Sequence, residues 1–451
     1  MKKLLKWLGL AILVLVVLPL LVWIVWNAFD DKLDPKAAAY GAVRAAAVPD
    51  AENGHFAVIG MSAPDGADAI DYGKAWVAEA RAAARENRPE KREEVKRAKR
   101  PALCDPIKTS CIVLAREKPE EAAAQLNAFR EDFGRYDKLL QYKRYEEVLD
   151  YVVRVDAILP NYGGMTETQR AYLLRIAAAV NAGNVEAGLE MLERELAFQR
   201  VLLGGTQSLL GKMLANSLYA RDLAFIADLL QQHGVQLRPY SARLAAMAPP
   251  LDRAALKLDT VMEGEYRWVM TAFQDSFAAR KGIGIFGGII ETAGAGFFYK
   301  KNATVNKAYE IYSAMGTASL APADGFAEAW KKVPTAEQMW RFAFWDFFDN
   351  PVGKILLGVG MPAFDGYVLR MHDLDAINRL VGLRIALLDA GVDADDVQTF
   401  VAKADARFYD PYTVKPMVWD AAARRLSVKI SEHTVKRQYG FVDKGRAFVP
   451  L

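Results

Sequence analysis

The sequence predicts a mainly α-helical protein with an N-terminal transmembrane helix, an irregular helical bundle or set of helical hairpins, and a small C-terminal β element. Three observations lead to this fold class. Residues 7–26 form an apolar run without a charge. Residues 119–240 carry apolar side chains at helical spacing, interrupted by short loop signals. Residues 426–430 alternate apolar and polar side chains, as a half-buried strand does.

The composition is typical of a folded protein. The chain has 451 residues, of which 52% are hydrophobic and 25% charged, so it can bury a sizeable core. Because 58 basic residues face 55 acidic ones, the formal net charge is only +3, and no overall field favours nucleic acid. We therefore expect no nucleic-acid partner. The length predicts two or three domains, although one large helical domain is also allowed.

The apolar run at residues 7–26 is the strongest single signal. Its 20 residues would rise about 30 Å as a helix, enough to cross the hydrocarbon core of a bilayer. Lysines precede the run, whereas Asp30 and Asp31 follow it, and this bias keeps the N-terminus in the cytoplasm. A cleaved signal peptide is the alternative, but its apolar core is shorter and a small-x-small cleavage pattern is missing here. The sequence predicts a single-pass protein of the bacterial inner membrane, with residues 1–6 cytoplasmic, residues 7–28 as the anchor and the main domain periplasmic.

The two cysteines, Cys104 and Cys111, are predicted to form a structural disulfide. An oxidising compartment favours the bond, and a loop of this length would add about 2–3 kcal/mol in the chain-entropy model. Two free thiols are the alternative. We expect no metal ion, because two thiols and four scattered histidines do not make a zinc site. The Cys-x-x-Cys spacing of a redox pair is also absent from the sequence.

Residues 29–118 are predicted to form a tether and an N-terminal helical region that includes the cysteine pair. Residues 30–50 indicate a tether or a first helix, and residues 52–60 a short strand or turn. Residues 72–85 are rich in Ala, Glu and Arg at helical spacing and predict a helix. The mixed charges at residues 86–100 predict a solvated helix or loop, with a basic docking patch for anionic lipid or peptidoglycan as the alternative.

Residues 119–400 are predicted to form a helical domain. The pattern is helical throughout residues 119–240, and its breaks imply helical hairpins. These breaks lie at residues 160–164, 181–184 and 204–205. No fixed period recurs, so an irregular bundle is favoured over a tetratricopeptide-like repeat array. Residues 251–281 predict a further long helix.

The composition changes at residues 282–299, which hold six glycines and a single charge, Glu291. Gly282, Gly284 and Gly287 match the G-x-G-x-x-G spacing of dinucleotide-binding turns. The segment follows a predicted helix rather than a strand, and no βαβ pattern surrounds it, so we expect no nucleotide and no other cofactor. Close helix packing through small residues is the favoured interpretation, and a membrane-dipping hairpin is the alternative.

Two groups of residues could supply acid–base chemistry. Glu291 lies in apolar company and could have a raised pKa, as a general acid requires, but the sequence identifies no second carboxylate. His372, Asp373 and Asp375 could form an acid–base cluster, yet no Gly-x-Ser-x-Gly elbow or His-Glu-x-x-His helix supplies its companions. The favoured interpretations are a satisfied buried glutamate in the first case and, in the second, a helix N-terminus with Asp373 or Asp375 capping residues 374–388.

Two features near the C-terminus complete the predicted fold. Residues 340–348 hold six aromatic side chains, which predicts burial on more than one helix face, with a lipid or partner surface as the alternative. Residues 401–451 are predicted to form the small β element. In it, residues 417–419 would pair with residues 426–430.

Several short blocks resemble uncharacterised, membrane-anchored envelope proteins of proteobacteria. These blocks are NGHFAVIG at residues 53–60, NPVGK at residues 350–354, YVLRMHDLD at residues 367–375, and DPY at residues 410–412 with the following stretch to Trp419 and Asp420. The resemblance covers most of the exported part. It implies location and architecture, and it brings no activity and no catalytic residue.

The leading functional hypothesis from the sequence is a non-enzymatic interaction or scaffold protein of the cell envelope, held in the membrane by residues 7–28 and bound to an envelope protein partner. One alternative is a hydrolase or lyase acting on an envelope polymer with Glu291 or His372. Another is a carrier of lipid or another apolar ligand that uses residues 282–299 and 340–348. An enzyme requires a polar cleft, a lipid carrier requires an apolar cavity, and a scaffold requires neither.

Overall fold

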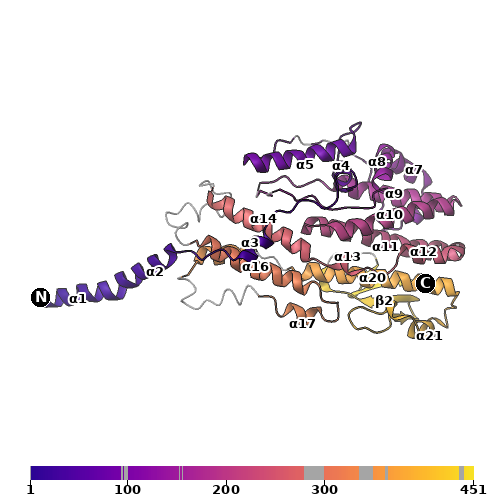
Figure 1. Cartoon of the computed structure of the whole chain (residues 1–451). Helices are drawn as coiled ribbons and strands as arrows, with labels where there is room; N and C mark the ends of the chain where they lie inside the picture. Colours follow the sequence, from indigo (N-terminus) through magenta and orange to yellow (C-terminus); the bar gives the residue numbers. More distant parts are fainter. Residues whose placement is uncertain are drawn as a thin grey trace.

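The computed structural model describes residues 2–92, 95, 100–151, 153, 154, 156–278, 299–334, 349–360, 364–435 and 441–451. Over these residues the protein is mainly helical, with a small sheet near its C-terminus, so the predicted fold class is confirmed at this level. Figure 1 shows a body of packed helices, from one end of which the N-terminal helical segments project.

The apolar N-terminal run is helical in three consecutive segments. Helix α1 is Lys2–Ile12, the π-helical segment η1 is Leu13–Val17, and helix α2 is Leu18–Ala28. Pro19 lies in the first turn of α2, and its ring would clash with the carbonyl of Leu15 in a regular α-helix, which accounts for altered bonding just before it. Taken one by one, none of the helices in the described part of the chain combines the length and apolar content that crossing a membrane requires.

Residues 30–34 fasten these segments to helix α16, Lys301–Ala318. The Asp30 carboxylate accepts a hydrogen bond of 2.7 Å from the backbone N–H of Asn302 and so satisfies the first turn of α16. Further along, the Asn306 side chain accepts from the N–H of Asp34 at 2.8 Å and donates to a backbone carbonyl in the same segment. The predicted tether is therefore held along the body, and helix α3, Pro35–Tyr40, follows it.

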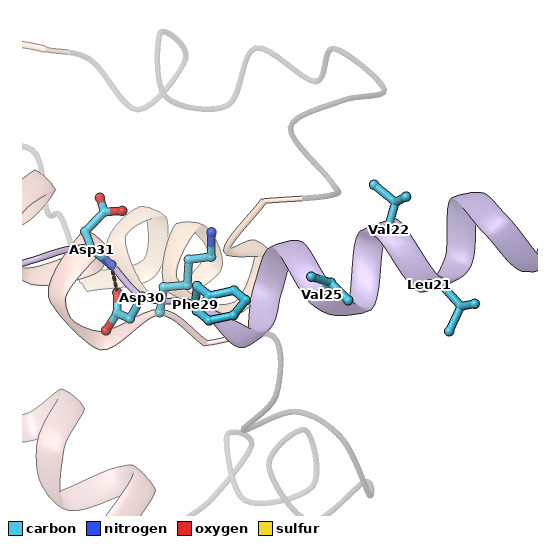
Figure 2. Close-up of a pocket in the computed structure, with 7 residues that line it drawn as sticks. Leu21, Val22, Val25, Phe29, Asp30 and Asp31 are labelled. Atoms are coloured by element: carbon cyan, nitrogen blue, oxygen red, sulfur yellow. Dashed lines mark hydrogen bonds between the residues drawn. The ribbon is translucent and has the colours of Figure 1, made fainter.

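The last turns of α2 border a hollow of about 510 Å³ beside Lys300. Figure 2 shows the side chains that line it, which change from apolar to acidic within a few positions. They are Leu21, Val22, Val25, Phe29, Asp30 and Asp31.

Helices α4, His55–Gly60, and α5, Ala69–Glu86, form a packed pair along one side of the body (Figure 1). The helix predicted at residues 72–85 is confirmed as α5. The short strand or turn predicted at residues 52–60 is wrong, because residues from His55 onward are helical. All six residues of α4 are buried, and such all-round burial suits a short core helix.

The central layer consists of long helices joined by short loops. The loop signal at residues 181–184 is confirmed, since one helix ends at Asn181 and the next begins at Val185. Residues 204–205 are the last two residues of that second helix, and the break follows them at residues 206–208. Continuous helix is wrong for residues 141–159, which form turns and irregular chain wherever the structure describes them. The break predicted at residues 160–164 is confirmed as far as Tyr162, because the next helix begins at Gly163. The helices of this layer are α6 (Cys111–Glu117), α7 (Pro119–Ala128), α8 (Arg130–Leu139), α9 (Gly163–Asn181), α10 (Val185–Gly205), α11 (Leu209–Leu237) and α12 (Ser241–Met247).

The second half of the chain adds helices on the other side of α11. The predicted helix at residues 251–281 is divided into a short helix and a long one. Residues 282–298 and 340–348 lie outside the described residues, so their predicted packing roles stay predictions. The helices are α13 (Arg253–Leu256), α14 (Asp259–Ala278), α16, α17 (Phe326–Trp330), α19 (Pro351–Gly360), α20 (Asp365–Ala390), α21 (Val397–Ala402) and α22 (Glu432–Val435).

A four-stranded antiparallel sheet packs against α20. Its order is β1-β2-β4-β3, and the predicted hairpin is confirmed by the pairing of Trp419 with Leu426. The main hydrophobic core extends from Ala37 to Val449 and so includes both the helices and the sheet. The strands are β1 (Val418–Asp420), β2 (Arg425–Lys429), β3 (Val442–Asp443) and β4 (Arg446–Pro450).

Candidate ligand-binding cavity

A cavity of about 590 Å³ lies between the α4–α5 pair and helices α11, α14 and α20. The irregular segment at residues 147–162 forms much of its wall. Most of the lining side chains are apolar. They include Ile59, Val77, Val148, Leu209, Met213 and Trp268.

Large apolar residues are exposed where this cavity meets solvent. Leu159 is 63% exposed and Ile158 43% exposed on the irregular segment. Leu210 at the start of α11 is 44% exposed, and Trp268 on α14 is 42% exposed. Single exposed apolar residues are ordinary, but several around one cavity indicate a surface that binds an apolar partner.

Glu147 fixes the start of α11 at the cavity wall. Its carboxylate accepts hydrogen bonds from the backbone N–H of Gln207 at 2.8 Å and of Ser208 at 2.7 Å, and from the Ser208 hydroxyl at 2.6 Å. The same hydroxyl accepts from the N–H of Gly211 at 3.0 Å as the N-cap of the helix. Glu147 thus accepts hydrogen bonds from N–H groups at the start of α11 that have no acceptor within the helix.

Glu265 on α14 binds the same helix start. Its carboxylate accepts from the backbone N–H of Leu209 at 2.8 Å. Burial, with a smaller contribution from the charge of Glu147, raises the pKa of Glu265. The adjacent Gly264 allows this close approach, because a Cβ there would lie 2.1 Å from the carbonyl oxygen of Gln207.

His55 is the imidazole at the inner end of the cavity. Its Nδ1 lies 3.3 Å from the hydroxyl of Tyr145. Burial lowers the pKa of His55 to about 3, and the nearby positive charge of Arg81 acts in the same direction. The ring is therefore neutral at pH 7 and cannot supply a cation to an anionic ligand.

An arginine is stacked on Trp76, one of the residues that line the cavity. The guanidinium of Arg92 lies 3.4 Å from the ring centroid of Trp76 and pairs with Glu90. Burial raises the pKa of the Glu90 carboxyl. A desolvated cation–π contact of this kind holds the indole in place, so that Trp76 lines the cavity as a fixed apolar surface.

Three of the polar side chains at this cavity make contacts within the protein, and the guanidinium of a fourth, Arg370, lies 4.9 Å from the ring centroid of Tyr367. Glu147 and Glu265 accept backbone hydrogen bonds, and His55 lies beside Tyr145 as a neutral ring. Acid–base catalysis requires groups that converge on one substrate position, and the lining residues that the structure describes do not show that geometry. The arrangement can hold an apolar molecule.

Three of the four sequence-predicted acid–base residues lie on α20, away from the cavity lining. Glu291 lies outside the described residues. His372, Asp373 and Asp375 lie in the interior of α20, which begins at Asp365, so the prediction that an aspartate caps a helix here is wrong. None of the three residues lines the cavity.

Within α20 these three side chains have different neighbours. The His372 ring packs against Phe326, with ring centroids 5.4 Å apart, and burial lowers its pKa to about 4. Asp373 accepts hydrogen bonds of 2.6 Å from the Tyr412 hydroxyl and 3.0 Å from the N–H of Ser431. Asp375 pairs with an arginine one helical turn away. Asp373 therefore holds the chain before β1, at Tyr412, and after β2, at Ser431, against α20.

Cys104 and Cys111 form a disulfide, with a Cα–Cα distance of 5.5 Å, as predicted. The loop that they close is fixed to the central layer. Arg170 donates to the carbonyl oxygen of Cys104 at 2.9 Å, and Arg221 pairs with Asp105 at 3.0 Å. These contacts favour a structural bond.

The chain matches no protein-family model, and neither a curated protein nor a solved structure shows significant similarity to it. Sequence reasoning missed the cavity. It predicted the break at residues 160–164 but continuous helix before it, although the β-branched residues there do not favour a helix.

Proposed function

We propose that this chain is a membrane-tethered protein that binds an apolar ligand, such as a lipid acyl chain, in the cavity between the α4–α5 pair, α11, α14 and α20. The observation that carries the proposal is the apolar lining of a cavity of about 590 Å³ with exposed apolar side chains at its opening. Ligand sites in proteins enclose roughly 300–1,000 Å³, so the cavity has room for such a molecule. Burying its exposed residues against a ligand would be favourable by about 25 cal/mol per Å².

The membrane tether is part of the proposal. Segments α1, η1 and α2 follow one another without a break, and most of their described side chains are apolar and exposed. An exposed apolar rod of this kind is stable when lipid surrounds it. The charge bias around it favours a cytoplasmic N-terminus and a periplasmic body. A protein held in this way has a bilayer as a nearby source of acyl chains.

This proposal differs from the leading hypothesis of the sequence analysis. A scaffold needs no internal apolar cavity, and a hydrolase needs convergent acid–base groups. The cavity favours the third hypothesis, a carrier of an apolar ligand, and it uses residues other than those that the sequence indicated for that role.

Photolabelling of the full-length protein in phosphatidylcholine nanodiscs with a diazirine-bearing fatty acid tests the proposal. We expect the label in residues 147–162 and on α14 near Trp268, as located by peptide mass spectrometry. Met213→Trp, which fills the cavity, and Leu210→Lys, which charges its opening, should each abolish this labelling.

The matched control is Val418→Lys, because Val418 is 48% exposed, similar to Leu210, and lies on the edge strand β1. This variant should label as the wild type does. Labelling that is absent from the cavity, or that persists in both cavity variants, would refute apolar-ligand binding at this site.

A further inference from the structure

A second cavity, of about 700 Å³, lies at the opposite end of the body from the N-terminal segments. Its walls are the last turns of α11 and α20 and the chain around Arg424 and Leu451. Figure 1 shows α12 and the C-terminus at this end, far from α1. The apolar-ligand cavity shares no residue with it.

Arg384 supplies a buried positive charge to this second cavity. It lies on α20 and is only 8% exposed. Its Nε donates to the carbonyl oxygen of Pro450 at 3.1 Å, and it forms no ion pair with a carboxylate of the residues that the structure describes. A buried guanidinium remains protonated and is normally paired, because desolvating an uncompensated charge is costly.

Two further arginines line the same cavity. Arg238 lies across the end of α20, where a Cβ on Gly391 would fall 1.9 Å from its Nη2. Gly391 has a φ of +61° and ends the helix, so only glycine suits both the backbone and the guanidinium at this position. Arg424 is exposed, and its carbonyl accepts from the N–H of Leu451 at 3.0 Å.

The remaining polar lining offsets little of this positive charge. The acidic side chain on the lining is Asp393, which is exposed and forms no ion pair with the three arginines. His233 and the neighbouring glutamines add hydrogen-bonding groups, and the Nε2 of His233 lies 2.9 Å from the Oδ1 of Asn181. Among the lining side chains, three arginines therefore face one carboxylate.

We propose that this second cavity binds the phosphate group of a soluble ligand, with Arg384 at its base and Arg238 and Arg424 at its opening. Guanidinium groups present paired N–H donors that match the oxygens of phosphate, and a half-enclosed site strengthens such bonds. A soluble source follows from position, because the cavity lies at the end of the body away from the segments that we propose to enter the membrane. The proposal does not depend on the apolar-ligand cavity.

Isothermal titration of the full-length protein in phosphatidylcholine nanodiscs with inorganic phosphate tests this site. Chloride at equal ionic strength is the reference. We expect saturable binding in the wild type, and a loss of at least about tenfold in affinity in Arg384→Met, since a charge-assisted hydrogen-bond pair is removed. Arg424 is exposed, so Arg424→Ala should leave the core intact. It should also weaken phosphate binding several-fold.

Arg144→Ala is the control, because Arg144 is a half-exposed surface arginine outside the cavity. It should bind phosphate as the wild type does. Absence of saturable binding, or equal affinity in the wild type, Arg384→Met and Arg424→Ala, would overturn the proposal. Binding to phosphatidylglycerol vesicles that depends on Arg384, without binding of inorganic phosphate, would show that the ligand is a lipid headgroup and that the soluble assignment is wrong.

Discussion

Replacing Glu195 by Gln should stabilise the protein at pH 8 and leave its stability at pH 4 nearly unchanged. Glu195 is completely buried between α8, α9 and α10. One carboxylate oxygen accepts from the hydroxyl of Tyr136 at 2.9 Å and from the amides of Gln199 at 2.8 Å and Gln169 at 3.3 Å. The other oxygen has no hydrogen-bond partner among the described residues.

The magnitude follows from the pKa of this carboxyl group. Burial raises the pKa of Glu195 from 4.5 to about 7, although these hydrogen bonds and the charge of Arg221 oppose the change. Burial, and then the charge of Glu195, also raises the pKa of the buried Asp222, to which Gln169 donates at 2.8 Å.

The direction of the pH effect follows from proton binding. Because the folded state holds its proton to higher pH than the unfolded state, stability falls as the pH rises from about 4.5 through 7. At 1.36 kcal/mol for each unit of pKa, this loss is about 3 kcal/mol. Glutamine keeps an acceptor oxygen and carries no charge, so the variant should avoid most of the loss.

Thermal and urea unfolding of the full-length protein in detergent, followed at pH 4 and pH 8, measure this difference. Glu193→Gln is the matched control, since Glu193 lies on the same helix but is about half exposed and pairs with Arg243. It should change stability by less than about 1 kcal/mol at either pH. A wild-type pH dependence in Glu195→Gln would show that Glu195 does not titrate in this range, and the argument would fail.

Three other predictions follow from contacts described above. Asp373→Ala should lower the free energy of unfolding by about 2–4 kcal/mol, because the hydroxyl of Tyr412 loses its acceptor. Scanning calorimetry measures this loss, and an unchanged midpoint of thermal unfolding would contradict it. Replacing Cys104 and Cys111 together by Ser should cost about 2–3 kcal/mol and make stability insensitive to reductant, as urea unfolding with and without dithiothreitol would measure. A reporter that is active only in the periplasm should be active when fused after Leu451, whereas an inactive but full-length fusion would contradict the proposed topology.

Local patterns were sufficient to predict most of the helices. Helices α5, α9 and α10 were predicted because Ala-rich and amphipathic spacing repeats over many residues, and glycine or asparagine marks their ends. The β1–β2 hairpin was predicted from the alternation of apolar and polar residues at 426–430 and the short segment that separates them from residues 417–419. Strands β3 and β4 were missed, since β3 has only two residues and β4 contains three consecutive apolar residues, Ala447 to Val449, although its burial alternates.

The irregular wall of the cavity could not be predicted from periodicity. Residues 141–162 take their conformation from distant partners. Asn53 accepts from the backbone N–H of Glu146 and donates to its carbonyl, and Glu147 reaches residues about 60 positions later in the chain. Such pairings hold the segment extended against the helices, and a single sequence does not display them.

The same cause explains the wrong interpretation of Asp373. Its acceptor atoms serve donors 39 and 58 residues away, on Tyr412 and Ser431. From the sequence, an aspartate before an apolar run is most simply an N-cap, because that role needs only local donors. The helix instead begins eight positions earlier, and the carboxylate is free to bind the sheet region because its own backbone is already satisfied within the helix.

Charged groups are buried in the helical core, and apolar groups are exposed at the cavity. Both features lower the stability of the protein without a ligand. The centre of the helical layer buries Glu195 and Asp222, whereas the cavity exposes Leu159, Leu210 and Trp268. Each buried carboxylate opposes folding at neutral pH, and each exposed apolar side chain leaves burial energy unused. The core around Glu195 recovers part of that cost through hydrogen bonds from Tyr136 and its neighbours. The exposed apolar side chains of the cavity gain burial free energy only when an apolar molecule covers them. Adding such a ligand should therefore raise the unfolding temperature of the wild type more than that of Met213→Trp.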